Sequence, residues 1–296
     1  MNKHSRLMTT IIAVVATLIL SVSSVFAANS DDWAINNYIE VIGQGMAPPT
    51  AVNEVHGKML ARRAAVADGY RQLAEMVKGV QVESGTDVEM MMLNSDDVKL
   101  SVAATIKGAT VVSERDLGDG GYEVTMRVPI FGVSNSLAKA VIPKPAVVEP
   151  LPAPVPDVIP SVPADSMKTG TTVHTNIEKN GTSSMDAIGG YTGVVVDCRG
   201  LGLKPVMSPV IKNDKGISIY GHKNLDYDKV VSEGMANYST DLNQVSRAGN
   251  NPLIIKAISL TDHNANPIIS TADANRILIE NSVSHFLDNV KVVLVR

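Results

Sequence analysis

A single cysteine is the residue with the most obvious potential for chemistry. Cys198 lies in VVVDCRGLGLKP, between Asp197 and Arg199, and it is the only cysteine among the 296 residues. A nucleophilic thiol needs a neighbouring base and a lowered pKa, and no histidine lies close to Cys198 in the sequence. We therefore interpret Cys198 as a half-buried small residue at a strand end, with a thiol enzyme as the less favoured alternative.

Other patterns that mark catalytic or metal sites are weak. Asp262–His263 lies in TDHNANP, which is typical of a polar turn rather than a catalytic dyad. The six histidines, at 4, 56, 174, 222, 263 and 285, lack metal-ligand spacing. Gly43-Gln44-Gly45 lacks the third glycine of a dinucleotide fingerprint, and no Gly-x-Ser-x-Gly element occurs. The sequence predicts no catalytic residue, no metal site and no cofactor.

The loop after Cys198 is the candidate binding site. Gly200 and Gly202 permit backbone conformations that other residues rarely adopt, and Arg199 and Lys204 add two positive charges. With exposed backbone amides, these cations could hold a carboxylate or a glycan. Binding of a ligand or partner by Arg199, Gly200, Gly202 and Lys204 is therefore a prediction.

A charged stretch, ARRAAVADGYRQLAEMVKGVQVESGT, covers residues 61–86. Within it Asp68, Arg71 and Glu75 are spaced so that they neighbour one another on a helix surface. Catalytic carboxylates would need a cleft that separates their pKa values. We interpret these charges as the solvated face of an amphipathic helix.

The elements that surround this stretch predict a first α+β domain over residues 28–140. Residues 34–47 are typical of a strand, and a helix is expected from Thr50 to Lys78, ended by Gly79. Residues 80–93 should be extended, 95–107 helical, and 109–117 and 122–131 a pair of strands joined by a turn at 118–121. The expected core-facing stripe of the long helix is Val52, Val55, Met59, Val66, Tyr70, Leu73 and Val77.

A second α+β domain is expected over residues 169–296. YTGVVVDC and VKVVLVR read as buried strands, VMSPVIKNDKGISIYG as a hairpin, and NPLIIKAISLT as a further strand. Ser270 and Asp273 form a capping box for a helix with Ile279, Val283 and Phe286 on one face. The predicted fold class is thus two small two-layer α/β sandwich domains, each with a helix on an antiparallel or mixed sheet.

A proline-rich linker, residues 141–168, joins the two predicted domains. It holds eight of the fifteen prolines, and proline disfavours both helix interiors and central strands. Such a run favours extended polyproline II at about 3.1 Å per residue, so it could separate two domains by roughly 60 Å. We interpret it as a spacer; the alternative is a ligand for a proline-binding module.

The N-terminus predicts export. Lys3, His4 and Arg6 precede the apolar run LMTTIIAVVATLILSV, and Val25-Phe26-Ala27 places small residues around a cleavage site after Ala27. This is the plan of a cleavable Sec-type signal peptide, residues 1–27; a retained membrane anchor is the alternative. Because no cysteine lies near the cleavage site, we expect a protein without an N-terminal lipid, in the periplasm or exported to the outer membrane.

Composition limits the classes of partner. The chain is 45% hydrophobic and 19% charged, with a formal charge of −4, which suits a folded protein. Nucleic-acid binding needs clustered Lys and Arg, and the sequence has no basic tract. We therefore expect no nucleic-acid partner.

Residues spread over about 35–140 resemble a known family. They comprise Ala61-Arg62-Arg63-Ala64-Ala65, Asp68, Arg71, Leu73-Ala74-Glu75, Gly79-Val80, Val82, Ser84 and Thr86, the earlier Gly43, Gly45 and Ala47, and the later GATVVSERDLGDGGYEVTMRVPI. This pattern resembles the Lpp-twenty lipoprotein family, and it is similar to the N-terminal domain of the flagellar assembly protein of sheathed polar flagella. The resemblance covers about 100 of the 296 residues.

The resemblance implies a bacterial envelope module that acts by contact rather than catalysis. We expect a non-enzymatic scaffold or adaptor whose partners are envelope or flagellar proteins, with peptidoglycan and self-association as further options. The alternatives are an activator of cell-wall synthases and a polymer-binding module. The sequence departs from the lipoprotein pattern because it lacks the lipidation cysteine.

Overall fold

The computed structural model describes residues 33–156, 158–161 and 186–296. The predicted signal peptide and part of the predicted linker lie outside the described residues. The described chain contains both helices and strands, and the strands form antiparallel and parallel sheets. This confirms the predicted α+β class, while the exact domain boundaries remain a prediction.

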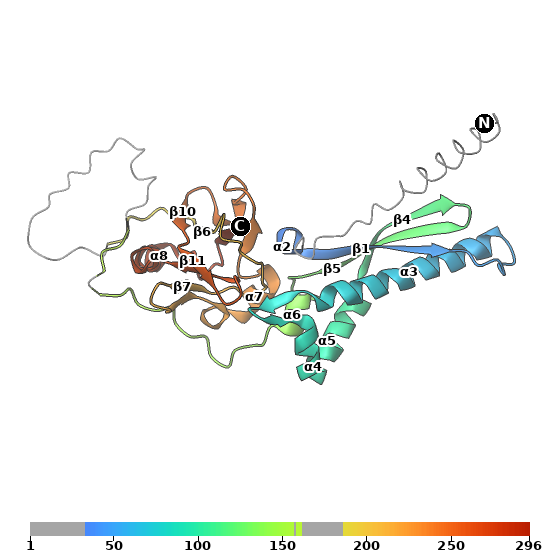
Figure 1. Cartoon of the computed structure of the whole chain (residues 1–296), viewed down its shortest axis with the longest axis horizontal. Helices are drawn as coiled ribbons and strands as arrows, with labels where there is room; N and C mark the ends of the chain where they lie inside the picture. Colours follow the sequence, from blue (N-terminus) through green and yellow to red (C-terminus); the bar gives the residue numbers. More distant parts are fainter. Residues whose placement is uncertain (1–32, 157, 162–185) are drawn as a thin grey trace, which may run out of the picture. The chain divides into compact units, whose positions relative to one another are not determined.

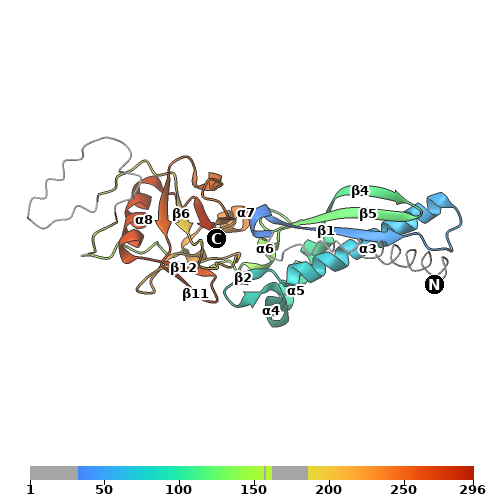
Figure 2. The same cartoon turned by 45° about the horizontal axis from the view of Figure 1, so that its top comes forward.

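The N-terminal part is a three-stranded antiparallel sheet covered by one long helix. The strands β1 (Tyr38–Met46), β5 (Gly121–Pro129) and β4 (Thr110–Gly118) pair in the order β1-β5-β4. The helix α3 (Glu54–Lys78) packs along β1 and β5, and Figures 1 and 2 both show it lying beside β1. The predicted long helix on an antiparallel sheet is therefore confirmed.

The side of α3 that faces the sheet differs from the predicted stripe. Its buried residues recur at every fourth position: Gly57, Ala61, Ala65, Gly69, Leu73 and Val77. In contrast Val52, Val55 and Met59 are 83%, 69% and 59% exposed. The predicted stripe is therefore wrong over the first half of the helix, because small residues rather than large apolar ones face the sheet there.

Two glycines of β1 explain why small residues of α3 face the sheet. A Cβ atom added to Gly43 would lie 2.2 Å from the backbone oxygen of Ala65, and one added to Gly45 would lie 2.2 Å from that of Ala61. Such distances are far inside van der Waals contact, so the helix backbone approaches the strand at positions without side chains. The Gly-Gln-Gly segment that resembles part of a nucleotide fingerprint is thus a packing feature.

The charges on α3 are not merely solvated, because one group of them covers the outer edge of β1. The Asp68 carboxylate accepts hydrogen bonds from the Gln44 backbone N–H (3.1 Å) and from Arg71 Nη2 (2.7 Å). Gln72 Nε2 donates to the carbonyl of Ile42 (2.9 Å) and to Asp68 (2.7 Å). These side chains satisfy backbone groups that an edge strand would otherwise leave open.

The segment predicted to be extended, residues 80–93, is mostly not a strand. It forms a short hairpin of β2 (Gln81–Glu83) and β3 (Thr86–Asp87), then the helix α4 (Val88–Asn94). Gly85 takes a φ of +73° in the turn, and the Asp87 side chain caps α4 by accepting from the Met90 N–H (2.8 Å). The predicted second helix is confirmed as α5 (Asp96–Lys107), capped by Ser95.

The C-terminal part contains two four-stranded sheets. In the first, β10 (Pro252–Lys256), β6 (Gly193–Asp197), β13 (Val292–Val295) and β9 (Asn237–Ser239) are all parallel, an arrangement that the sequence reading did not foresee. The second has the order β11-β12-β7-β8 and includes the predicted hairpin of β7 (Ile211–Asn213) and β8 (Ser218–Tyr220). Its other strands are β11 (Ser259–Thr261) and β12 (Asn266–Ile269).

Short helices complete the described chain. They are α2 (Trp33–Asn36), α6 (Leu137–Val141), η2 (His222–Asn224), α7 (Tyr227–Glu233) and η3 (Ser246–Ala248). The predicted last helix is α8 (Thr271–Ser284), and Ser270 caps it as expected, accepting from the Asp273 N–H (2.9 Å). Val283, however, is 62% exposed, so the predicted apolar face of this helix is wrong at that position.

The contact between α3 and β1 gives the first testable prediction. Replacing Gly43 by Ala should destabilise the protein by about 3 kcal/mol or more, because the new methyl group overlaps helix backbone that has no rotamer to change. Gly57→Ala is the matched control, since its Cβ would lie 3.4 Å from its nearest neighbour and alanine favours a helix by about 1 kcal/mol. Urea unfolding of both variants measures the difference; equal stabilities would contradict the close approach.

Candidate functional site

The predicted binding loop begins where β6 ends. Arg199 forms a two-point ion pair with Asp197, through Nε to Oδ1 and Nη2 to Oδ2, each at 2.8 Å. Hydrogen bonding from Arg199 holds the pKa of the Asp197 carboxyl below its usual value. The Arg199 charge therefore already has a partner within its own loop.

The remainder of the loop has the tight geometry expected from its glycines. Gly200 and Gly202 have φ values of +79° and +77°, which glycine adopts readily. The Lys204 backbone N–H donates to the carbonyl of Asn264 (2.9 Å), while the Lys204 side chain is exposed. All four predicted residues lie in one loop, and their binding of a carboxylate, glycan or partner stays a prediction.

The Cys198 thiol is not placed for nucleophilic chemistry. The side chain is fully buried, and Sγ lies 3.8 Å from the carbonyl oxygen of Val196, to which it donates. Burial, with a smaller effect of Asp197, raises the thiol pKa to about 12. The thiol thus stays protonated near neutral pH, which argues against the thiolate that the rival thiol enzyme would need.

The Asp262–His263 segment forms a turn. Asp262 and His263 both have positive φ angles, 52° and 55°. The Asp262 carboxylate accepts from Lys212 Nζ (2.7 Å) and Asn266 Nδ2 (2.8 Å), and the hydrogen bond from Lys212 leads the interactions that lower its pKa. Lys212 and Asn266 thus hold the Asp262 carboxylate within the turn, in agreement with the predicted polar turn.

The described part of the chain lacks two further features. No three His, Cys, Asp or Glu side chains gather there in a way that could hold a metal ion. Within the same residues, no helix has the length and apolar character needed to cross a bilayer.

A group of buried polar residues lies on α8, for which the sequence predicts only an amphipathic helix. Its buried polar residues are Thr271, Asn275, Arg276, Glu280 and Asn281. Charged residues are rarely buried unless they are paired. The Arg-Glu spacing of four residues was visible in the sequence, but it is equally common on exposed helix faces, so the signal could not be recognised.

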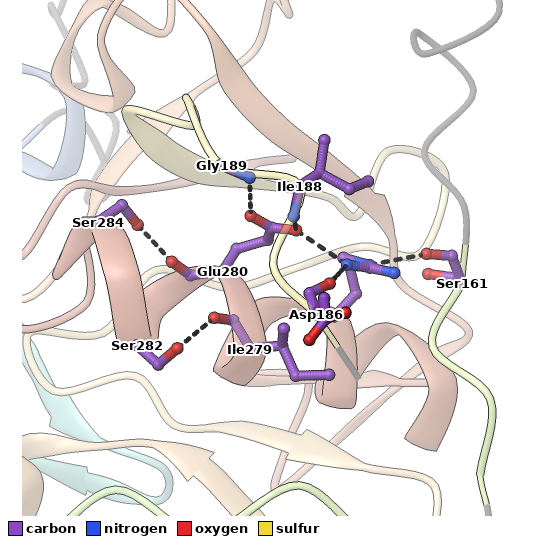
Figure 3. Close-up of polar contacts among 9 residues, drawn as sticks. Ser161, Asp186, Ile188, Gly189, Ile279, Glu280, Ser282 and Ser284 are labelled. Carbon is purple, nitrogen blue, oxygen red and sulfur yellow. Dashed lines mark hydrogen bonds and ion pairs between the residues drawn. The ribbon is translucent and has the colours of Figure 1, made fainter. Parts of the chain in front are cut away.

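Glu280 is the centre of this constellation (Figure 3). Its fully buried carboxylate accepts from the backbone N–H groups of Ile188 and Gly189, each at 2.8 Å, and from Arg276 Nη1 at 2.9 Å. Arg276 in turn donates to the carbonyls of Ser161 (3.1 Å) and Asp186 (3.3 Å). We refer to Arg276 and Glu280 with these backbone partners as the α8 anchor.

The α8 anchor satisfies the condition that makes a buried charge tolerable. Both Glu280 oxygens accept a backbone N–H, and one of them also meets the guanidinium. Removing one member of such a pair leaves an uncompensated buried charge, which costs about 3–5 kcal/mol. The anchor therefore fixes residues 186–189 and the backbone at Ser161 to the same helix.

The proline-rich segment contacts the same helix instead of running free. We refer to residues 149–161 as the strap. Asn275 accepts a hydrogen bond from the Val155 N–H (2.7 Å) and donates to the carbonyls of Val155 (3.0 Å) and Val158 (2.9 Å). The Glu149 N–H donates to the carbonyl of Lys223 (2.8 Å). The prediction of a free, fully extended spacer is therefore wrong for the strap.

These contacts define what the polar residues of α8 do chemically. Asn275, Arg276 and Glu280 direct their polar atoms mainly at main-chain N–H and C=O groups of other segments. Recognition of main-chain groups depends on extended geometry and little on side-chain identity. These α8 side chains thus hold segments of this chain's own backbone.

Two family models match separate regions of the chain. Residues 48–128 match the LPP20 lipoprotein model, and residues 193–296 match the model of the second domain of Treponema pallidum Tp0624. Curated proteins give no match. The first match confirms the resemblance found in the sequence and indicates an envelope-associated protein; the two matched regions are consistent with a two-part layout.

A substitution at the α8 anchor gives the second prediction. Glu280→Gln should lower the free energy of unfolding by about 3–5 kcal/mol, because it removes the buried charge opposite Arg276 and aims an amide N–H at a backbone N–H. The matched control is Glu75→Gln, which removes the same Arg–Glu pair at i,i+4 on α3, where the side chains are 59% and 65% exposed.

The exposed control should change stability by less than about 1 kcal/mol. Chemical denaturation of the two variants beside the parent protein measures both effects. Losses of equal size would show that the buried pair has no special role.

Proposed function

We propose that this protein is a non-enzymatic scaffold or adaptor of the bacterial cell envelope that acts through protein–protein contact. The observation that carries the proposal is the set of large apolar side chains that α3, α4 and α5 leave exposed, among them Val55, Met59, Met90, Leu93 and Leu100. The envelope location is supported by the LPP20 match.

An exposed apolar surface on the helices α4 and α5 supports contact with a partner. Met90, Leu93 and Leu100 are 46%, 81% and 69% exposed. Clustered exposed apolar side chains mark contact sites when they form a patch, and methionine adapts to differently shaped partners. Val55 and Met59 of α3, with Val52 just before the helix, are also exposed.

In this proposal, the predicted N-terminal signal peptide determines where in the envelope the protein is located. The predicted Sec-type signal delivers the chain to the periplasm, where contact with a partner retains it. The chain's single cysteine, Cys198, is buried at the end of β6, and it lies far in sequence from the predicted cleavage site. We therefore propose that protein contact, rather than a lipid, retains this protein, unlike the lipoproteins after which the LPP20 family is named.

Site-specific photocrosslinking in cells tests the contact function. A photoreactive phenylalanine analogue at Leu93 or Val55 should yield discrete adducts with one or a few envelope proteins. The same analogue at Glu75, a side chain that is 65% exposed on the polar side of α3, serves as the matched control and should yield far less adduct.

The proposal fails if neither apolar position gives an adduct above the level at Glu75 while the variants accumulate normally. Adducts with peptidoglycan fragments instead of proteins would favour the polymer-binding alternative. In parallel, Cys198→Ser should leave adduct formation unchanged.

A further inference from the structure

A pocket of about 430 Å³ lies beside β9, the edge strand of the parallel sheet. It is lined by residues 237–240 and 244–247, together with Val293 of β13 and Ile35 of α2. In open sheets of parallel strands, ligands bind beside the carboxyl ends of the strands. The pocket is separate from the predicted Arg199–Lys204 loop, because no residue of that loop lines it. We refer to it as the β9 pocket.

The β9 pocket lies on the face of the sheet that the main core does not cover. Parallel sheets usually bury both faces under other elements. On this face the cover is a loop and the single turn of η3, whose apolar side chains pack on the strands in a small separate cluster. Its members are Val195, Val293 and Val295 of the sheet and Leu242, Val245 and Ala248 above them. Because Val245 and Val293 also line the pocket, one of its walls is apolar.

Arg247 brings an unbalanced positive charge to the pocket. Its Nε donates to the carbonyl of Val290 (2.6 Å), and Nη1 donates to the carbonyl of Glu233 and to Asn237 Oδ1, each at 2.7 Å. Nη2 donates to the carbonyl of Gly234. All four acceptors are neutral, and no carboxylate of the described residues forms an ion pair with this guanidinium. Burial accordingly lowers its pKa from the usual value.

The same bonds leave one donor of Arg247 open. A guanidinium has five N–H groups, and the four bonds above use four of them, so one N–H of Nη2 has no acceptor among the described residues. The four bonds tie the end of α7 and account for the fixed position of the side chain. They do not balance its charge, whereas an anion that accepted the fifth N–H would form a charge-assisted hydrogen bond.

The backbone of β9 offers a second donor. The Arg296 N–H donates to the carbonyl of Ser239 (2.9 Å), so the main chain of Ser239 faces β13. Main-chain groups of successive strand residues point to opposite sides, and those of Tyr238 therefore point away from β13. β9 ends the strand order of its sheet, which makes this side an open edge. Tyr238 also lines the pocket.

We propose that the β9 pocket binds a carboxylate. The carboxylate accepts the open N–H of Arg247 and the outward N–H of Tyr238, and an apolar group attached to it contacts the wall formed by Val245 and Val293. Two donors and one cation match the two oxygens and single charge of a carboxylate better than the higher charge of a phosphate. The carboxylate can belong to a small organic acid or to the C-terminus of a polypeptide. The site does not depend on the proposed contact function.

Two probes, acetate and an N-acetylated alanyl-valine dipeptide with a free C-terminus, are titrated into the purified, isotope-labelled chain while NMR records its amide signals. Both should shift the signals of Tyr238 and Ser246 saturably. Their neutral counterparts, acetamide and the dipeptide amide, should bind at least about tenfold more weakly, because they lose a charge-assisted hydrogen bond. Tighter binding of the dipeptide than of acetate identifies a polypeptide C-terminus as the source, and equal binding identifies a small acid.

A pair of variants at Thr240 tests the position of the site without touching Arg247. Thr240 is exposed and lines the pocket. In Thr240→Glu the new carboxylate repels the ligand or takes its place, so both probes should bind at least about tenfold more weakly. Thr240→Gln has the same size without the charge and should keep the parental affinity. Circular dichroism confirms that both variants are folded.

Several results would overturn the proposal. Acetamide that binds as tightly as acetate, a Thr240→Glu protein that binds as tightly as the parent, or inorganic phosphate that binds more tightly than either probe would each do so. The absence of saturable shifts at Tyr238 and Ser246 would show that Arg247 serves only to tie the end of α7. None of these results bears on crosslinking at Leu93 and Val55, so failure of this inference is distinguishable from failure of the proposed function.

Discussion

The buried carboxylate of Glu280 is the constraint on which the C-terminal part depends. A charge taken out of water must be fully bonded, and here the bonds come from Arg276 and from the backbone of Ile188 and Gly189. Arg276 extends the constraint to Ser161 and Asp186. One helix thereby fixes two segments that are remote in sequence, and the neighbouring Asn275 adds the strap. The buried polar side chains of α8 are explained by the backbone segments of this chain that they hold.

A different constraint shapes the N-terminal part. Gly43 and Gly45 let the backbone of α3 approach β1 within the radius of a side chain, so the inner face of the helix must consist of small residues. Asp68 and Gln72 then complete the hydrogen bonding of the β1 edge. Because the small residues of α3 pack against the sheet, the larger Val52, Val55 and Met59 are left exposed to solvent. The same packing that stabilises this part thus leaves apolar surface for contact, which connects the fold with the proposed adaptor function.

The sequence was sufficient where local chemistry decides the structure. The long helix, the hairpin of β4 and β5, the cap at Ser270 and the buried run of β6 all follow from spacing, turns and capping residues. It was insufficient where tertiary contact decides. Nothing local distinguishes Ala61 and Ala65 as the inner face of α3, since larger apolar residues formed an equally periodic stripe. The Arg276–Glu280 pair has the spacing of a surface pair, and only the segments that cover it make it buried. The prolines predicted a segment without helix or strand, as the described residues 149–156 and 158–161 are, but its attachment depends on Asn275, more than a hundred positions away.

Hydrogen exchange of individual backbone amides tests the central claim, that α8 side chains hold polypeptide segments through their main chains. Ile188, Gly189 and Val155 lie outside any helix or strand, so ordinary secondary structure gives their N–H groups no protection. We expect strong protection at Ile188 and Gly189, where the buried Glu280 accepts, and weaker but measurable protection at Val155, which is only half-buried and donates to the neutral amide of Asn275. Exchange of all three amides at the rate of an unstructured chain would contradict the account.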